Sequence, residues 1–147
     1  MTTLSGVGVL IGLVVALPAT SHGQAGGSQD STGRTTLEGV YSASQAEKGQ
    51  QTYRKNCAAC HAAAAYTGSA FRRLWTGRSV YDFFNLIRTT MPNDKPGKLG
   101  RGQYAEIMAY VLKLNGFPAG EDDLPDDDEP LKQIRIEMPV PAKGPTP

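Results

Sequence analysis

Apolar side chains recur three or four positions apart in three stretches of the chain, at residues 43–56, 80–89 and 103–114. This spacing puts them on one face of an α-helix, where they can pack against a neighbouring element. No stretch of useful length alternates between apolar and polar residues, as a half-buried strand does. The pattern therefore predicts an all-α domain with three main helices. Their apolar faces are formed by Ala46, Gly49 and Tyr53, by Val80, Phe83, Phe84 and Ile87, and by Ile107, Tyr110, Val111 and Leu114.

Polar residues mark the ends of these helices. Ser42 and Ser44 are alternative N-caps of the first helix, each with a Gln or Glu three residues later, and Ser79 can cap the second. Asn115 and Gly116 supply a stop signal after the third. The segments between the helices are expected to be long loops, which in so small a domain usually surround something. The two expected loops are residues 62–75 and 91–102.

The first 25 residues read as a secretory signal. None of them is charged, and residues 7–17 form an apolar run broken only by two glycines. The run is too short for an ordinary membrane span. Small residues precede a cleavage site after Ala25, with Ser21 as the runner-up. We therefore expect an exported, periplasmic protein with no stable membrane insertion once residues 1–25 are removed.

Composition divides the remaining chain into three parts. Residues 26–36 are rich in Gly, Ser and Thr and are expected to form a flexible leader. Residues 37–117 are the expected folded domain, with 11 basic and 5 acidic residues. Residues 118–147 are expected to form an acidic and then Pro-rich tail, with 3 basic and 8 acidic residues. A basic domain would steer toward an acidic partner. The whole-chain charge of +1 argues against nucleic acid as the main partner.

Cys57, Cys60 and His61 form the C-x-x-C-H pattern of covalent haem attachment. Two thiols one helical turn apart can each form a thioether with one porphyrin, and the next imidazole can bind its iron. A thioredoxin-like site needs a βαβ setting, and a structural zinc site needs four ligands where this chain has two cysteines. A local disulfide remains possible in an oxidising compartment but leaves His61 without a role. The other histidine, His22, lies in the expected signal, so one haem c per chain is predicted.

A second ligand on the opposite side of the iron is expected from a methionine. Met91 lies just after the second predicted helix and is followed by Pro92, which stiffens the turn. A thioether there stabilises ferrous iron and raises the potential. Met108 falls within the third helix, where packing is its expected role, and Met138 lies in the expected tail. His61 and Met91 are therefore the predicted metal ligands.

These residues resemble class I cytochrome c, over about Leu37 to Phe117. In that family the first helix carries G-x-x-x-[FY] before the haem motif, matched here by Gly49 and Tyr53. The last helix carries an aliphatic residue and an aromatic three residues on, matched by Ile107 and Tyr110. The resemblance implies that Gly49 lets these two helices cross closely and that Tyr53 packs beside Ile107 and Tyr110. Residues 91–99 are similar to the family's methionine loop.

The resemblance is closest to a bacterial subgroup, and it has one departure. Residues 75–81 and 109–117 are similar to monohaem cytochromes found with periplasmic quinoprotein dehydrogenases. The family usually has a proline soon after the haem motif, whose carbonyl accepts the axial histidine's other N–H. No proline lies between His61 and Met91 here. The sequence therefore does not identify the carbonyl that accepts the other ring N–H of His61.

Aromatic residues near the motif are expected to help line the haem pocket. Trp75 and Arg78 are candidates to hold the haem propionates, since buried carboxylates need donors. The other expected lining residues are Tyr66, Phe71, Phe83 and Phe84.

Together these features predict a periplasmic carrier of single electrons rather than an enzyme. Its expected partners are redox proteins: a dehydrogenase as donor and an oxidase or another cytochrome as acceptor. A dedicated subunit of a periplasmic dehydrogenase complex is the first alternative, because Pro-rich extensions suit docking. An open-site haem enzyme or gas sensor is the second, and needs an exchangeable iron position with acid or base groups beside it.

Overall fold

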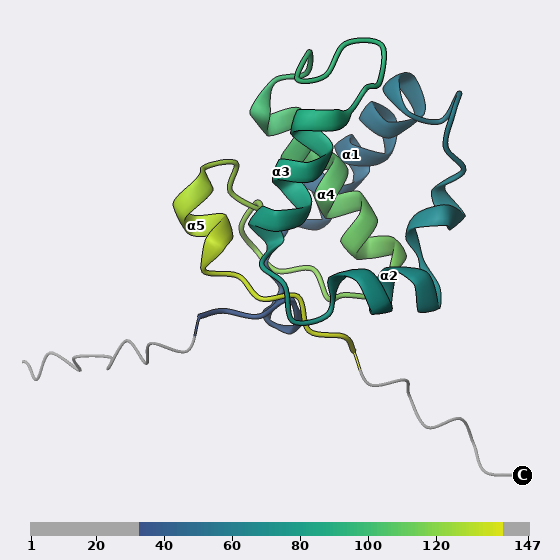
Figure 1. Cartoon of the computed structure of the whole chain (residues 1–147). Helices are drawn as coiled ribbons and strands as arrows, with labels where there is room; N and C mark the ends of the chain where they lie inside the picture. The colour runs from purple at the N-terminus through teal and green to yellow at the C-terminus, as the bar shows by residue number, and fades with distance from the viewer. Residues whose placement is uncertain (1–32, 140–147) are drawn as a thin grey trace, which may run out of the picture.

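The computed structural model describes residues 33–139, so the expected signal, most of the leader and residues 140–147 lie outside it. Within that range the regular elements are all helical, and β-type pairing is limited to isolated bridges. Figure 1 shows α1, α3 and α4 at the centre, with α2 and α5 on opposite sides. The all-α prediction is confirmed. The elements are the 3-10 helices η1 (Thr36–Glu38) and η2 (Ala63–Tyr66), and the α-helices α1 (Ala43–Asn56), α2 (Gly68–Trp75), α3 (Val80–Thr90), α4 (Arg101–Leu114) and α5 (Asp128–Lys132).

The three predicted helices are present as α1, α3 and α4. Ser42 rather than Ser44 caps α1, because its hydroxyl accepts the Gln45 N–H at 3.0 Å. Ser79 caps α3 in a reciprocal capping box with Asp82. α4 begins two residues earlier than predicted. No helix between residues 33 and 139 is both long and apolar enough to cross a lipid bilayer.

α1 and α4 cross in close contact at Gly49. A Cβ atom at this position would lie 1.8 Å from the carbonyl oxygen of Glu106, so only glycine fits. Just beyond the crossing, Tyr53 packs with Ile107 and Tyr110, and the Tyr53 and Tyr110 ring centroids are 5.6 Å apart. The helix crossing implied by the family resemblance is therefore present.

The segment expected to be a loop at residues 62–75 is largely helical, so that prediction was wrong. It forms η2 and α2. Phe71 and Trp75, one turn apart, are buried in the main core at 2% and 8% exposure. Their burial stabilises α2, which has no side-chain N-cap at Thr67 to mark its start.

The segment expected to be a tail packs on the helical body. We call residues 118–138 the C-terminal arm; Leu124, Leu131, Ile134 and Ile136 within it are all buried at 3% exposure or less. The predicted domain boundary at Phe117 therefore differs from the structure. Because acidic residues surround these apolar ones in the sequence, the arm did not show a helical or strand pattern. Burial of the apolar side chains offsets the conformational entropy that is lost when the arm becomes ordered.

Backbone hydrogen bonds hold the arm between two other segments. Ile136 donates its N–H to the Arg78 carbonyl and accepts the Gly77 N–H, both at 2.8 Å. On its other side, Arg135 donates to the Arg34 carbonyl at 2.8 Å and accepts the Thr36 N–H at 3.0 Å. Figure 1 shows that both ends of the described chain lie at the lower end of the body, from which they leave in different directions.

Candidate cofactor-binding site

An apolar cavity of about 300 Å³ lies between the end of α1, the facing sides of α3 and α4, and the loop that joins those two helices. Its walls are mainly aliphatic and aromatic, as is typical of cofactor pockets. All four residues predicted as haem ligands or attachment points line it. The aliphatic part of the wall comes from Ile87, Leu99, Ile107 and Val111, and the four predicted residues are Cys57, Cys60, His61 and Met91.

Cys57, Cys60 and His61 form a tight turn at the end of α1. Cys57 donates its N–H to the Tyr53 carbonyl at 2.8 Å, and its own carbonyl accepts the N–H groups of Cys60 at 3.1 Å and His61 at 2.9 Å. The Cys57 side chain is half-buried and Cys60 is exposed. The two cysteines are not joined to each other, so both sulfurs are available for thioethers.

Burial and a nearby lysine act in opposite directions on the Cys57 thiol before any attachment. Burial, the larger effect, raises the pKa of Cys57, while Lys98 lowers it. Since the thiolate is the reactive form, burial disfavours reaction at this half-buried sulfur, and Lys98 offsets part of that effect.

Met91 enters the cavity from α3 and the loop that follows it. We call residues 91–99 the methionine loop. The Met91 N–H donates to the Ile87 carbonyl at 2.9 Å, which fixes the residue to the last turn of α3. Its carbonyl accepts the Tyr104 hydroxyl at 2.7 Å and the Gly97 N–H at 3.3 Å. Met108 is fully buried in the core and Met138 packs against that core, and neither lines the cavity.

Two tyrosines surround His61. The Tyr53 hydroxyl donates to the His61 carbonyl at 2.8 Å, and the Tyr66 ring meets the imidazole edge-on with centroids 5.7 Å apart. Burial, reinforced by Tyr66 and then Cys57, raises the pKa of Tyr53 to about 12. The hydroxyl therefore stays a donor throughout the physiological range. No residue from 33 to 139 accepts a hydrogen bond from the His61 ring, so the structure does not identify the acceptor that the family's proline carbonyl usually provides.

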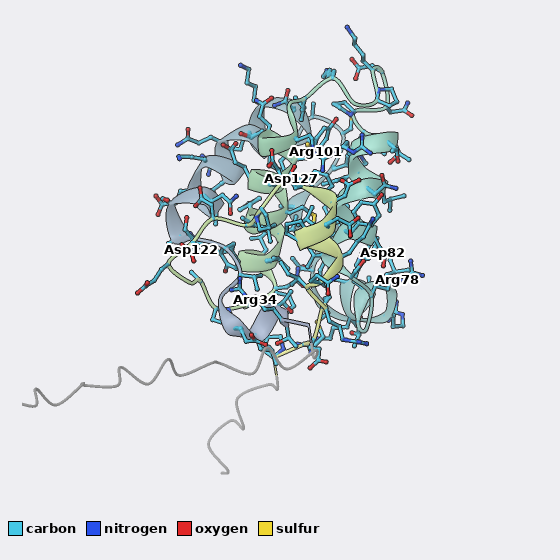
Figure 2. All side chains as sticks on the ribbon, turned by 90° about the vertical axis from the view of Figure 1, so that its left-hand side faces the viewer. Arg34, Arg78, Asp82, Arg101, Asp122 and Asp127 are labelled. Carbon is cyan, nitrogen blue, oxygen red and sulfur yellow. The ribbon has the colours of Figure 1, made fainter. Side chains whose placement is uncertain are left out.

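The prediction that Trp75 and Arg78 hold the propionates finds no support in their positions, because neither lines the cavity. Trp75 lies behind Phe83, a cavity residue, with the two rings 4.4 Å apart. The Arg78 guanidinium lies 5.5 Å from the Trp75 ring and is drawn near Asp82 in Figure 2. Trp75 is buried in the core, and Arg78 is exposed and stacks on the Trp75 ring.

Of the four other aromatic residues that were predicted to line the pocket, two do so. Tyr66 and Phe83 line the cavity as predicted, whereas Phe71 and Phe84 belong to the core behind it. Tyr104 was missed. Its spacing from Ile107 and Val111, three and seven residues on, places it on the same helical stripe and could have identified it.

The residues fit a covalently attached haem. Two available sulfurs and an imidazole lie on one segment of the wall, a thioether lies on another, and the rest is apolar. Among residues 33–139, no three His, Cys, Asp or Glu side chains gather to form another kind of metal site.

Comparison with curated proteins and with solved structures gives no match. Residues 44–111 match the family model described as "Cytochrome C oxidase, cbb3-type, subunit III". The matched range begins at the start of α1 and ends in α4, so it contains the whole cavity region described above.

Proposed function

Residues 44–111 form a c-type cytochrome domain, whose cofactor is a covalently bound haem c, and from this premise we propose that the chain carries single electrons through an iron ligated by His61 and Met91. The observation that carries the proposal is that both cysteines, His61 and Met91 line one apolar cavity. When bound, the haem supplies one-electron chemistry between ferric and ferrous iron.

Each residue has a separate task in this proposal. Cys57 and Cys60 would hold the porphyrin through two thioethers, and His61 would bind its iron. Met91 supplies a thioether, which favours the ferrous state. Leu99 and Ile107 exclude water, which further favours the less charged, reduced centre. With His61 and Met91 both bound to the iron, electron transfer to another protein would need no bond to form or break.

The exposed position of Cys60 suggests where electrons enter and leave. Because Cys60 is exposed and Cys57 is half-buried, a porphyrin attached to both would have its attached edge near the surface. The expected partners are redox proteins that dock over this edge, a donor such as a dehydrogenase and an acceptor such as an oxidase or a second cytochrome. We place this exchange in the periplasm, on the strength of the signal-like residues 1–25.

A second candidate is a fixed subunit of a larger redox complex. The matched family is described as a subunit of an oxidase, which favours this alternative to free diffusion. Residues 118–138 pack on the body, so they are not a free extension that could dock a partner. The association with quinoprotein dehydrogenases stays a prediction. Co-purification of the native protein with its partners would distinguish a carrier from a subunit.

The ligand assignment is tested by two methionine variants of the holoprotein. Met91→Ala is expected to abolish the weak far-red sulfur-to-iron band of the oxidised protein, lower its potential and admit cyanide. The haem stays attached, because Cys57 and Cys60 are unchanged. Met108→Leu, the control, keeps the band and costs at most about 1.5 kcal/mol as a volume-conserving core change.

Two outcomes would contradict the proposal. A band that depends on Met108 and survives Met91→Ala would overturn the ligand assignment. A wild-type protein that lacks the band and binds cyanide or carbon monoxide quickly would have an open iron, and would favour the enzyme or sensor alternative.

A further inference from the structure

Two buried tyrosine hydroxyls bind the backbone carbonyls of the two proposed ligand residues. The Tyr53 hydroxyl donates to the His61 carbonyl at 2.8 Å, and the Tyr104 hydroxyl donates to the Met91 carbonyl at 2.7 Å. The two side chains are 4% and 1% exposed, and both line the cavity. The same chemical contact is thus repeated on both sides of one site.

Each contact satisfies a carbonyl that lies outside the regular helical ladder. His61 follows the turn after α1, and Met91 is the C-cap residue of α3. A buried phenol also needs an acceptor of its own. Each hydrogen bond therefore satisfies both the phenol hydroxyl and the backbone carbonyl. It also fixes the backbone of the residue whose side chain is the proposed ligand.

The two tyrosines come from the two helices that cross at Gly49. Tyr53 lies one turn after Gly49 on α1, and Tyr104 lies two residues before Glu106 on α4. Since the crossing leaves no space even for a Cβ atom, the two helices cannot easily shift relative to each other. The separation of the two hydroxyls is fixed by the packing of the helices.

From this arrangement we propose that Tyr53 and Tyr104 are a pair of positioning residues, which hold the backbones of His61 and Met91 at a fixed separation within the cavity that would hold the haem. The inference rests on the proposed axial ligation. In this role, the two hydroxyl groups connect the rigid α1–α4 crossing to the backbones of the two ligand residues.

The two contacts have unequal consequences. His61 directly follows Cys60, whose thioether to the porphyrin restrains the same segment. Met91 has no covalent restraint, and its position depends on the hydrogen bonds to Ile87, Gly97 and Tyr104. Loss of the Tyr104 hydroxyl therefore affects ligation more than loss of the Tyr53 hydroxyl.

The test measures cyanide binding to the oxidised, full-length holoprotein, since cyanide enters only when Met91 leaves the iron. Tyr104→Phe keeps the ring but removes the hydrogen bond. We expect the binding rate to rise about two- to tenfold, the factor that corresponds to one ordinary hydrogen bond. We expect Tyr53→Phe to change this rate less than Tyr104→Phe does.

Tyr41→Phe is the matched control. Tyr41 is 1% exposed and its hydroxyl donates to the Phe117 carbonyl at 2.7 Å, away from the cavity. If Tyr104 acts only through overall stability, Tyr41→Phe raises the cyanide rate to the same extent. Equal rates for these two variants, or a Tyr104→Phe rate equal to that of the wild type, would overturn the inference.

Failure of the underlying function gives a different result. If Met91 is not a ligand, the wild type lacks the far-red band and Met91→Ala leaves cyanide binding unchanged. That result overturns the proposed ligation, and the positioning role with it. A wild type with the band and a Met91→Ala effect, but no Tyr104→Phe effect, overturns the positioning role alone.

Discussion

At the scale of single residues, Tyr41 links the start of the folded body to the end of α4. Its hydroxyl donates to the Phe117 carbonyl, and burial raises the pKa of Tyr41 above the usual value of 10. The folded protein therefore holds this phenolic proton more tightly than the unfolded chain does. The resulting stability is fully present below about pH 10 and is lost as the pH rises through the raised pKa.

Tyr41→Phe is therefore expected to reduce the alkaline loss of stability. The free energy of unfolding of the wild type should fall as the pH rises above about 10, and the variant should fall less steeply. Some slope remains, because the pKa values of Tyr53 and Tyr66 are raised as well. Denaturant unfolding of the holoprotein at several pH values measures this. Identical slopes for wild type and variant would contradict the expectation.

The residues of the site differed in how far sequence could identify them. Cys57, Cys60 and His61 lie within five consecutive residues, so a single local motif identifies all three. Met91 was selected by its place after a helix and before a proline. The distances from Tyr53 and Tyr104 to backbone carbonyls depend on tertiary packing, which a single sequence does not contain. Trp75 was misassigned for the same reason, since an aromatic in the core resembles one in a pocket.

At the scale of elements, the α1–α4 crossing leaves no space for a side chain at Gly49. Gly49→Ala should force the Glu106 backbone away and destabilise the holoprotein, by about 1–3 kcal/mol or more as an overpacked core does. Gly102→Ala is the matched control in α4. Its Cβ would meet nothing nearer than an Asp126 oxygen at 3.8 Å, and alanine favours the helix by up to about 1 kcal/mol. Denaturant midpoints moving in the same direction for both variants would contradict this account.

The C-terminal arm has its own test. Ile136 is fully buried, so Ile136→Ala should cost about 2–5 kcal/mol. Leu74, which is 60% exposed on α2, is the control, and Leu74→Ala should change stability by no more than about 0.5 kcal/mol. If the arm were only loosely attached, the unfolding curves of the two variants would coincide.

Elements with complete local signals were predicted well, and the others were not. α1 and α3 each have a capping serine and a continuous apolar stripe, and their predicted bounds agree with the structure to within a residue. α2 has two buried aromatics but no cap. In the arm, single apolar residues are spread among acids and prolines, so burial by distant parts of the chain decides its structure.

At the scale of the whole molecule, opposite charges lie on different parts of the surface. The arm contributes most of the acidic residues, and part of this charge is bound to the body. Arg101 pairs with Asp128 at 2.5 Å and also donates to the Asp126 carbonyl. Figure 2 shows Arg101 on this face beside the start of α5. The expected approach of an acidic partner would therefore favour the surface away from the arm.

The mature holoprotein is expected to have a defined mass. Export should remove residues 1–25, and the single C-x-x-C-H motif should add one haem. Intact-mass measurement of protein matured in a bacterial periplasm should give residues 26–147 plus one porphyrin, retained after denaturation. A retained Met1 would indicate an uncleaved anchor instead, and two added haems would contradict the motif count.

The pairing of the two chain ends determines how this protein can be mounted on a solid support. The Thr36 hydroxyl donates to the Glu137 carbonyl and accepts the Glu137 N–H, both at 3.0 Å, so both ends lie at one pole. The methionine loop lies at the other pole in Figure 1. A linker to a gold electrode at either end would therefore direct that loop toward the solution. Attachment at the beginning or at the end of residues 33–139 should give films of the same orientation.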